Sequence, residues 1–328
     1  MRTLGAAIPV GLVGAGKHGE RYVRHILEDV PQLNLRLLCR RDAVAGREQA
    51  RRAGARYVAE FLELASSPEI EAVVVAAPPA MHRSICEAAA HAGKAILLEK
   101  PLAITRAEGL AIRDAVVAAS VPFLAAHTLR FNSVVRAVRE EIAALGVLHQ
   151  VCLSQRFEPS PLVWLDDPRV SGGGNVLHTG VHSFDLLRFF VGVDPSAVVA
   201  QTRRLVTRQT EDSFVALFSF PESLLGSVAG SRATAGRSGM IEVAGECGQI
   251  VADHVHGWAA RVRGTRSEPL LVAPPVPTVR EALRAFARMI RDGEPPPITL
   301  ADGLWAVSMA EACYRSARSG CEAEIEAA

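Results

Sequence analysis

Apolar runs alternate with helical patterns through the first part of the chain. Runs typical of buried strands are "IPVGLV", "LRLLC", "AVVVAA", "AILLE" and "VPFLAA". Between them lie stretches with a helical period after Gly19 and near residues 43–53, 81–92 and 105–119. This alternation predicts an α/β domain with a doubly wound parallel sheet over residues 1–126.

From Val147 onward the pattern changes to extended segments at shorter spacing, such as "LHQVCLSQRF", "DSFVALFSF" and "MIEVAGECG". Turn residues separate them, which predicts an open antiparallel sheet within an α+β domain that has helices on one face. Apolar residues on both alternations of "FVALFSF" indicate that both faces of the sheet are covered. We expect this domain over residues 127–298. We expect a C-terminal helix over residues 299–328 that packs back towards the first domain.

Composition narrows the classes of function. The 328 residues are 49% hydrophobic and 22% charged, and the net charge is +1. This net charge is not the excess of Lys and Arg that is typical of a nucleic-acid-binding protein, so a small-molecule partner is favoured. No apolar run approaches the ~18 residues typical of a transmembrane helix, so no membrane partner is expected. The six cysteines are scattered and form no C-x-x-C, which favours the cytoplasm.

The N-terminus "MRTLGAAIPVGLVGAG" imitates a signal peptide with its early arginine and apolar stretch. A glycine pattern follows at once, however, and favours a first strand. In "GAGKHG", Gly14, Gly16 and Gly19 stand between this strand and a helix, as the G-x-G-x-x-G fingerprint requires. Such glycines permit a tight turn, close approach to a pyrophosphate and close helix–strand packing. The first domain is therefore predicted to be a Rossmann domain that binds a dinucleotide.

The end of the second strand bears on the choice of cofactor. An acidic residue is expected there in an NAD enzyme, bonded to the ribose 2′-hydroxyl. This chain has Arg40 and Arg41 at that place and Asp42 just beyond. A guanidinium pairs well with a 2′-phosphate, so the sequence favours NADP. In the alternative, the arginines are surface charges, Asp42 serves the ribose and the cofactor is NAD.

Two further motifs carry candidate chemistry. "GKAILLEKPLA" places Glu99 and Lys100 directly after an apolar strand, at the edge where open α/β sheets bind ligands. "GGGNVLHTGVHSFD" places His178, His182 and Asp185 at i, i+4 and i+7, on one face if the segment is an α-helix. Two such histidines can share a metal, but the glutamate of H-E-x-x-H is absent, so no metal is expected.

The combination resembles the glucose–fructose oxidoreductase / inositol dehydrogenase / rhizopine-catabolism (Gfo/Idh/MocA) family. Four features carry the resemblance: "GLVGAGKHG", "AAPPAMHRSICEAAAHAGKAILLEKPLA", "HTLRFN" and "GGGNVLHTGVHSFD". The resemblance implies an NAD(P)-dependent oxidoreductase that acts on a CH–OH group of a sugar, keto-sugar or cyclitol. It also implies a homodimer or homotetramer formed through the C-terminal sheet. From the glycine fingerprint, the end of the second strand and the resemblance together, the expected cofactor contacts are Gly14, Gly16, Lys17, His18, Gly19, Arg40, Arg41, Ala77, Pro78, His82, Glu99 and Lys100.

The resemblance also assigns the catalytic group. The family's E-K-P lysine falls on Lys100, and the histidine of its D-x-G-x-H pair falls on His182. We expect His182 to exchange a proton with the reacting hydroxyl, because an imidazole changes charge near neutral pH. The family's aspartate falls on His178. This departure leaves three alternatives: redistributed acid–base roles, a preference for the reductive direction, or lost activity. His178 can also be a structural residue satisfied by a neighbour.

Other residues are expected near the substrate. Arg130 lies at the predicted junction of the domains, where it can bind a hydroxyl, carboxylate or phosphate, or form an ion pair between domains. Asp185 matches the family's final aspartate and is expected to bind substrate, or else to bond to backbone or an arginine. Trp164 can stack on a sugar or anchor a loop. Two other functions remain as alternatives: a cofactor-binding sensor or scaffold without turnover, and an NAD-dependent glycosidase.

Overall fold

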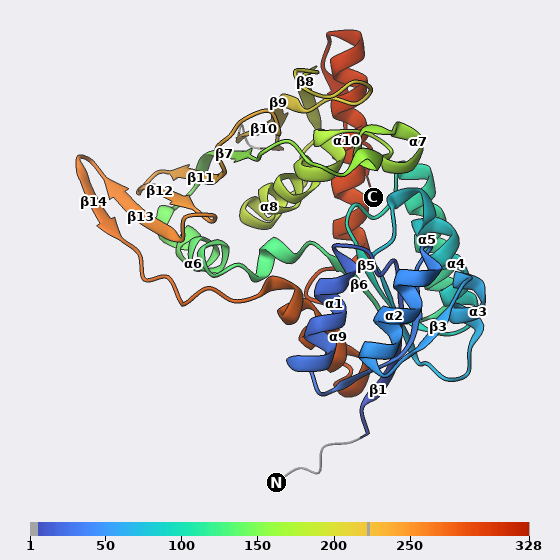
Figure 1. Ribbon diagram of the computed structural model, residues 1–328. Helices are drawn as coiled ribbons and strands as arrows, with labels where there is room; N and C mark the ends of the chain where they lie inside the picture. The colour runs from blue at the N-terminus through green and yellow to red at the C-terminus, as the bar shows by residue number, and fades with distance from the viewer. Residues whose placement is uncertain (1–5, 222–223, 328) are drawn as a thin grey trace. The chain divides into compact units, whose positions relative to one another are not determined.

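The computed structural model describes residues 6–221 and 224–327. Contacts divide the chain into two compact units, which are described here separately (Figure 1). The first unit contains residues 1–103, 107–128 and 277–303. The second contains residues 104–106, 129–276 and 304–328. Residues 1–5 of the N-terminal stretch that imitates a signal peptide lie outside the described residues.

The first unit is built on the six-stranded parallel sheet that the sequence predicts. Its strand order is β3-β2-β1-β4-β5-β6, which is the order of a Rossmann fold. The strands are β1 (Ile8–Val13), β2 (Leu33–Cys39), β3 (Arg56–Val58), β4 (Ala72–Val75), β5 (Ala95–Glu99) and β6 (Phe123–Ala126). Every residue of β4, β5 and β6 is buried, as expected of central strands that are covered on both faces.

Helices connect these strands. They are α1 (Gly19–Glu28), α2 (Ala43–Ala53), α3 (Phe61–Ser66), α4 (His82–His91) and α5 (Arg106–Ala119). The sequence predicted all of them except α3, which together with β3 is too short to show a period. Gly54 ends α2 in a left-handed conformation, with φ +65°, which is the usual role of glycine after a helix.

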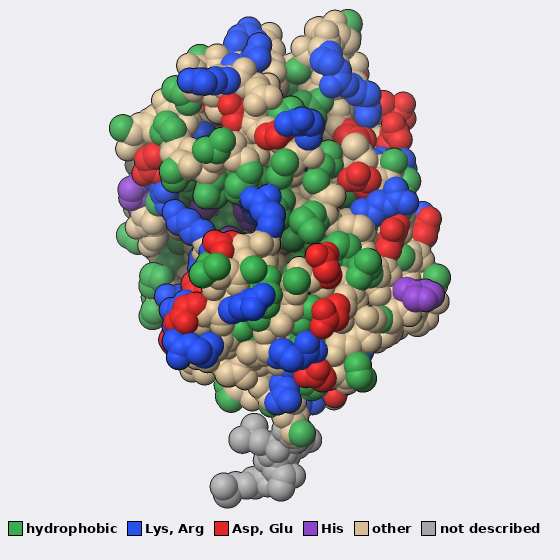
Figure 2. Space-filling model, turned by 45° about the vertical axis from the view of Figure 1, so that its right-hand side comes forward, with side chains coloured by type: hydrophobic (Ala, Val, Ile, Leu, Met, Phe, Trp, Pro, Cys, Tyr) green, Lys and Arg blue, Asp and Glu red, His purple; other side chains and the backbone are tan. Residues whose placement is uncertain are grey.

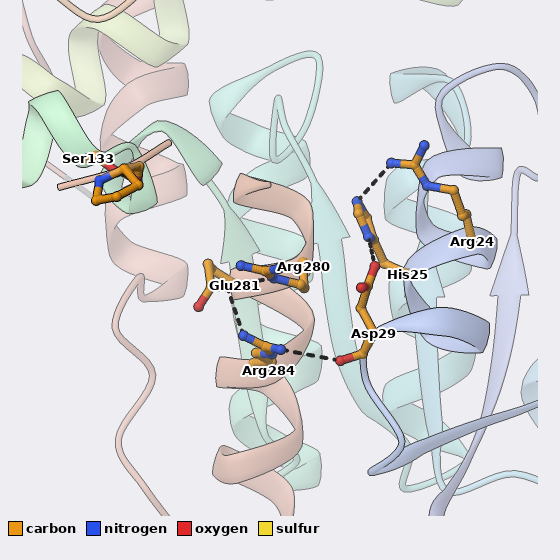
Figure 3. Close-up of polar contacts among 8 residues, drawn as sticks. Arg24, His25, Asp29, Ser133, Arg280, Glu281 and Arg284 are labelled. Atoms are coloured by element: carbon orange, nitrogen blue, oxygen red, sulfur yellow. Dashed lines mark hydrogen bonds and ion pairs between the residues drawn. The ribbon is translucent and has the colours of Figure 1, made fainter. Parts of the chain in front are cut away.

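A helix from late in the sequence completes the first unit. The helix α9 (Thr278–Asp292) lies beside α1 (Figure 1) and buries an apolar stripe that includes Leu283 and Phe286. A polar contact joins α9 to the end of α1 (Figure 3): Arg284 Nη2 donates to the carbonyl oxygen of Asp29, the C-cap of α1, at 3.4 Å. The Asp29 carboxylate is itself held within α1 by His25 Nδ1 at 2.6 Å. These contacts place α9 with the Rossmann sheet.

The contacts therefore divide the chain differently from the predicted boundaries at 126 and 298. Residues 277–303 belong to the first unit, and residues 304–328 belong to the second. The reason is packing. Helix α9 buries its apolar stripe in the first unit, whereas most of α10 (Leu300–Ser319) contributes to the second unit's core through Trp305, Met309 and Cys313. Sequence pattern shows that each helix has an apolar face, but not which partner covers it.

The second unit contains a nine-stranded sheet in the order β14-β13-β12-β11-β7-β10-β9-β8-β15. Its strands are β7 (Leu148–Arg156), β8 (Ala197–Arg203), β9 (Ser213–Ser219), β10 (Leu225–Ser231), β11 (Ser238–Gly245), β12 (Gly248–Asp253), β13 (Trp258–Arg263), β14 (Arg266–Pro269) and β15 (Ala323–Glu324). Neighbours pair antiparallel, except that β7 and β10 are parallel. The predicted antiparallel order is wrong at this pair, because the long connection between β7 and β10 lets the chain return in the same direction.

Helices cover one face of this sheet. The helices α6 (Ser133–Glu141) and α8 (Val181–Val191) pack on it, together with α10, whereas the short α7 (Pro168–Ser171) contacts the preceding turn η4 (Val163–Asp166). The core includes Phe184, Phe190 and Phe218. On the opposite face, the apolar side chains of Val215 and Leu217 are 55% and 57% exposed.

Surface charge is mixed. Lys or Arg and Asp or Glu side chains are interspersed over the face shown in Figure 2, in keeping with the net charge of +1. Over the described residues, no helix combines the length and apolar character needed to cross a membrane.

Candidate active site

The glycine turn after β1 has the three features expected of the fingerprint: a tight turn, close helix packing and backbone that is open to a ligand. Gly14 has φ +92°, and a Cβ there would lie 2.4 Å from the Ala77 backbone nitrogen. A Cβ on Gly19 would lie 2.3 Å from the Gly14 carbonyl oxygen, so α1 can pack on the turn only with glycine. A Cβ on Gly16 would meet nothing within 4 Å. Backbone is thus open at Gly16 next to the N-terminus of α1, which fits a dinucleotide pyrophosphate.

Glu99 joins this turn to the end of β5. Its Oε1 lies 2.6 Å from His18 Nε2 and accepts a hydrogen bond from the Tyr22 hydroxyl at 2.6 Å. Its Oε2 accepts from the Lys100 backbone N–H at 3.1 Å. Burial alone raises the pKa of Glu99, but His18, Lys100 and Tyr22 outweigh it and hold the pKa at about 2. The carboxylate therefore stays ionised and fixes the backbone just before Lys100.

His82 is fully buried at the start of α4 and ties two other segments together. Its Nε2 lies 2.9 Å from the Ala77 carbonyl oxygen, and its Nδ1 lies 2.9 Å from the Pro101 carbonyl oxygen. Burial lowers the pKa of His82, although both carbonyl contacts act in the opposite direction. Pro78 follows Ala77 and precedes the turn η1 (Pro79–Met81). The structure thus brings the "AAPPAMH" and "EKP" motifs together around one imidazole.

Arg40 reaches back from the end of β2 to the glycine turn. Its Nη1 donates to the Ala15 carbonyl oxygen at 3.2 Å and to Gln49 Oε1 at 3.1 Å. Arg41 is exposed beside it. Asp42 instead caps α2, since its Oδ1 accepts from the Ala45 N–H at 3.0 Å. Arg40 is therefore the member of this group that contacts the glycine turn.

In the second unit, the run of three glycines is explained by close packing. Gly172 ends α7 with φ +79°. A Cβ on Gly173 would lie 2.2 Å from the Tyr314 hydroxyl, and one on Gly174 would lie 1.9 Å from the Glu211 carbonyl oxygen. The Glu211 carboxylate in turn accepts hydrogen bonds from the Gly174 and Val176 N–H groups and from Tyr314. This cluster fixes the start of the histidine-bearing helix.

That helix does not begin as an α-helix. Val176–Gly180 form a π-helical turn, η5, which runs directly into α8. The prediction of one α-helical face for His178, His182 and Asp185 is wrong at His178, because a π-turn is wider and re-aims the residues before α8. His178 is buried, and its ring makes an edge-on contact with Trp164 at a centroid distance of 5.8 Å. His182 is half-buried in the first turn of α8.

A cavity of about 410 Å³ lies in the second unit, and His178 is part of its lining. Asn175 from the start of η5 and Arg232 from the segment after β10 line it as well. Three carboxylates on the lining, Asp166, Glu211 and Asp212, accept hydrogen bonds from backbone N–H groups of neighbouring loops. The cavity has the size of a small-molecule site, with polar groups from several segments.

Arg130 and Asp185 contact each other inside the second unit. Arg130 Nε lies 2.9 Å from Asp185 Oδ2, and Nη2 lies 2.6 Å from Oδ1. Such a bidentate pair is the arrangement expected of Arg and a carboxylate in a buried position. For Asp185 the sequence left substrate, backbone or an arginine as possible partners, and the structure shows an arginine.

Sequence reasoning missed Asn175, Glu211, Arg232 and Tyr314. The run of three glycines was the signal that could have indicated a close approach to the backbone at this place. The approaching groups, Glu211 and Tyr314, come from segments about 37 and 140 residues further on, and nothing in their local sequence marks them.

A fingerprint glycine turn on a six-stranded Rossmann sheet, joined to a second unit with a polar cavity, defines a dinucleotide-binding protein of two units. Residues 8–127 match the family described as "Oxidoreductase family, NAD-binding Rossmann fold". Residues 135–251 match the "GFO/IDH/MocA C-terminal domain". The chain belongs to the Gfo/Idh/MocA oxidoreductase family, as its motifs predict.

Several known proteins are similar over most of their length. A 1,5-anhydro-D-fructose reductase of Ensifer adhaerens is 29% identical over 80% of this chain and 82% of its own. A myo-inositol 2-dehydrogenase of Thermotoga maritima is 28% identical over 80% of this chain and 82% of its own. The crystal structure of GenD2 from gentamicin A biosynthesis, in complex with NAD, is 27% identical, with a TM-score of 0.88 over 99% of this chain and 98% of that one.

Proposed function

We propose that the protein transfers a hydride between a nicotinamide cofactor and a hydroxyl-bearing carbon of a sugar, keto-sugar or cyclitol. The observation that carries this function is the complete glycine turn of Gly14, Gly16 and Gly19 in a chain of this oxidoreductase family. The relatives are dehydrogenases and reductases of such compounds, which favours turnover over the sensor or scaffold alternative.

Lys100 and His182 are proposed to serve the same reaction. When bound, the nicotinamide accepts the hydride that leaves the substrate carbon, or returns it in the reverse direction. In oxidation the substrate hydroxyl must also lose its proton, and His182 is proposed to accept it. Lys100 is proposed to orient the substrate oxygen by a hydrogen bond. The hydrogen bond from its backbone N–H to Glu99, a buried carboxylate, supports a fixed position for it.

His178 is proposed to bind a substrate hydroxyl rather than to act as the family's aspartate does. Its place on the cavity lining supports this role. The edge contact from Trp164 supports a fixed ring orientation. In this interpretation the acid–base work belongs to His182, and Trp164 is a packing anchor.

NADP is the proposed cofactor, with NAD as the alternative. Arg40 supports NADP because it contacts the glycine turn, while the Asp42 carboxylate caps α2. Arg41, Lys17 and His18 are proposed to lie along the phosphates. Ala77, Pro78, His82 and Glu99 are proposed to shape the nicotinamide end. The two His82 contacts, with the Ala77 and Pro101 carbonyl oxygens, support this proposal because they tie the "AAPPAMH" and "EKP" motifs together.

Arg130 and Asp185 are proposed to be a structural pair instead of substrate ligands. Both carboxylate oxygens of Asp185 already accept from Arg130, which supports this assignment. We also propose a homo-oligomer formed through the uncovered sheet face that carries Val215 and Leu217, because exposed apolar patches mark interfaces. The six free cysteines support a cytoplasmic location.

The test is a steady-state assay that follows NADPH or NADH with a panel of keto-sugars, inosones, sugars and inositols. Lys100→Ala and His182→Ala should each lower kcat/KM by about 10²- to 10⁴-fold, and His182→Ala should leave cofactor binding intact. Lys94→Ala and His149→Ala are matched controls, since Lys94 precedes β5 at its other end and His149 is exposed on β7. Full activity in either catalytic variant would reject the assigned role.

A further inference from the structure

The cavity of the second unit holds an arginine without a counter-charge. Arg232 Nε donates to Thr179 Oγ1 at 3.0 Å, and its guanidinium lies 5.7 Å from the centre of the Phe157 ring. Within the described parts of the chain, no Asp or Glu forms an ion pair with it. Burial lowers the pKa of Arg232, and the nearby Arg237 acts in the same direction. Arginine nevertheless keeps its charge in proteins, so the cavity wall carries a partly buried cation.

A second feature of the same cavity is the buried side-chain amide of Asn175. Its side chain is buried, with the residue 1% exposed, and it lines the same cavity. Neither its Oδ1 nor its Nδ2 has a hydrogen-bond partner within the part of the chain that the structure describes. A buried amide without partners costs free energy, which a ligand with hydrogen-bonding oxygens would recover.

The acidic residues on the lining do not supply the missing counter-charge. Asp166 accepts from the N–H groups of Arg208, Gln209 and Thr210. These backbone contacts outweigh burial and hold the pKa of Asp166 at about 2. Asp212 likewise accepts from the N–H groups of the loop before it. Glu211 is bound to the glycine run and to Tyr314.

We propose that this cavity binds an oxyanion, either a carboxylate or a phosphate, carried by the sugar-like substrate of the proposed reaction. Arg232 makes the charged contact and Asn175 adds a neutral hydrogen bond. A volume of about 410 Å³ accommodates a monosaccharide-sized ligand. The inference rests on the proposed oxidoreductase function and narrows its substrates to acidic or phosphorylated sugars.

The test compares acidic ligands with their neutral parents by calorimetry in the presence of the cofactor. The pairs are D-glucuronate with D-glucose, D-galacturonate with D-galactose, and D-glucose 6-phosphate with D-glucose; inorganic phosphate alone is a fourth probe. The wild-type protein should bind at least one acidic member about 10- to 100-fold more tightly than its parent. The pair that shows this preference distinguishes a carboxylate from a phosphate, and tight binding of inorganic phosphate alone indicates a free anion as the ligand.

Arg232→Gln should reduce the ratio of the two affinities, acidic ligand over neutral parent, to near one. Arg232→Lys should keep part of the preference for the acidic ligand. Arg237→Gln is the matched control: the Arg237 guanidinium also lies close to the Phe157 ring, 5.3 Å from its centre, but Arg237 pairs with Glu158. Its loss should therefore leave the preference intact. Melting curves confirm that each variant is folded. Binding of acidic and neutral members with equal affinity, binding of neither, or a preference that Arg232→Gln leaves unchanged overturns the proposal.

Cofactor turnover in the same samples distinguishes failure of the oxyanion site from failure of the proposed oxidoreductase function. Oxidation or reduction of neutral sugars without any preference for acidic ones would reject the oxyanion site and keep the oxidoreductase. An Arg232-dependent preference in binding without any cofactor turnover would keep the oxyanion site and reject the oxidoreductase.

Discussion

Arg130 and Asp185 form a bidentate ion pair in which the Asp185 side chain is 1% exposed. The Arg130 guanidinium also lies 4.9 Å from the centre of the Phe189 ring. Both charges are therefore held inside the second unit by each other and by an aromatic face.

Removal of one member should destabilise the fold more than removal of both. Asp185→Ala removes the carboxylate that accepts from two nitrogens of a mostly buried guanidinium, and it is expected to lower the free energy of unfolding by about 3–5 kcal/mol. The double variant Arg130→Met/Asp185→Leu should recover much of that loss, as measured by urea denaturation. An Asp185→Ala protein of normal stability with a raised KM would instead assign these residues to the substrate.

The glycine turn offers a matched pair of variants. Gly14→Ala places a methyl group 2.4 Å from backbone at a positive φ, so we expect a poorly folded first unit. Gly16→Ala meets no protein atom within 4 Å and should fold normally. It should nevertheless weaken dinucleotide binding by tenfold or more, on the order of 1.4 kcal/mol or more, because the methyl group occupies the approach to the backbone. Normal cofactor affinity in Gly16→Ala would place the pyrophosphate elsewhere.

Glu99 should make the protein sensitive to acid. Its folded pKa of about 2 lies below the ordinary glutamate value, so protonation favours the unfolded chain. The stabilisation is present above about pH 4.5 and is lost as the pH falls towards about 2, by roughly 3 kcal/mol in total. Glu99→Gln should lack this component of the pH dependence of unfolding, whereas Glu71→Gln, at an exposed position, should parallel the wild type. Superimposable curves for Glu99→Gln and wild type would contradict the assignment.

Arg40 should decide between the two cofactors. If it pairs with a 2′-phosphate, Arg40→Ala weakens NADP+ binding by about 10- to 100-fold and changes NAD+ binding little. Arg36→Ala, an exposed position on the same strand, serves as the control. Both affinities are measured by calorimetric titration. If the protein binds NAD+ more tightly than NADP+, and Arg40→Ala leaves the NAD+ affinity unchanged, the NADP assignment is rejected.

The exposed face of the second sheet should mediate self-association. Leu217→Glu introduces a charge where an apolar side chain is 57% exposed. If copies of the chain meet there, light scattering will show a smaller species, because the charge must be desolvated in the interface. An unchanged mass in Leu217→Glu and in Val215→Asp would exclude this face.

The sequence predicts best where the chemistry is local. The strand–glycine–helix context of Gly14 to Gly19 and the buried strand before Glu99 need only neighbours along the chain, and both are present as expected. The parallel pairing of β7 with β10, the place of α9 beside α1, and the contacts of Glu211 with the glycine run depend on residues far apart in sequence. Periodicity shows that a face is apolar, but the partner that buries it is chosen by the packing of the whole unit.

The π-helical turn at Val176–Gly180 has a consequence for how such a site can change. Because it accommodates one more residue than an α-helical turn, deletion of a single residue there would restore a regular helix and leave α8 in its packed position. The side chains before and after the turn would keep their positions, because the extra residue of a π-turn is what keeps the two flanks in register. Only the residues within the turn, His178 among them, would point in new directions. Loss of one codon can thus change which side chain of this turn lines the cavity and leave the aromatic core beneath α8 intact.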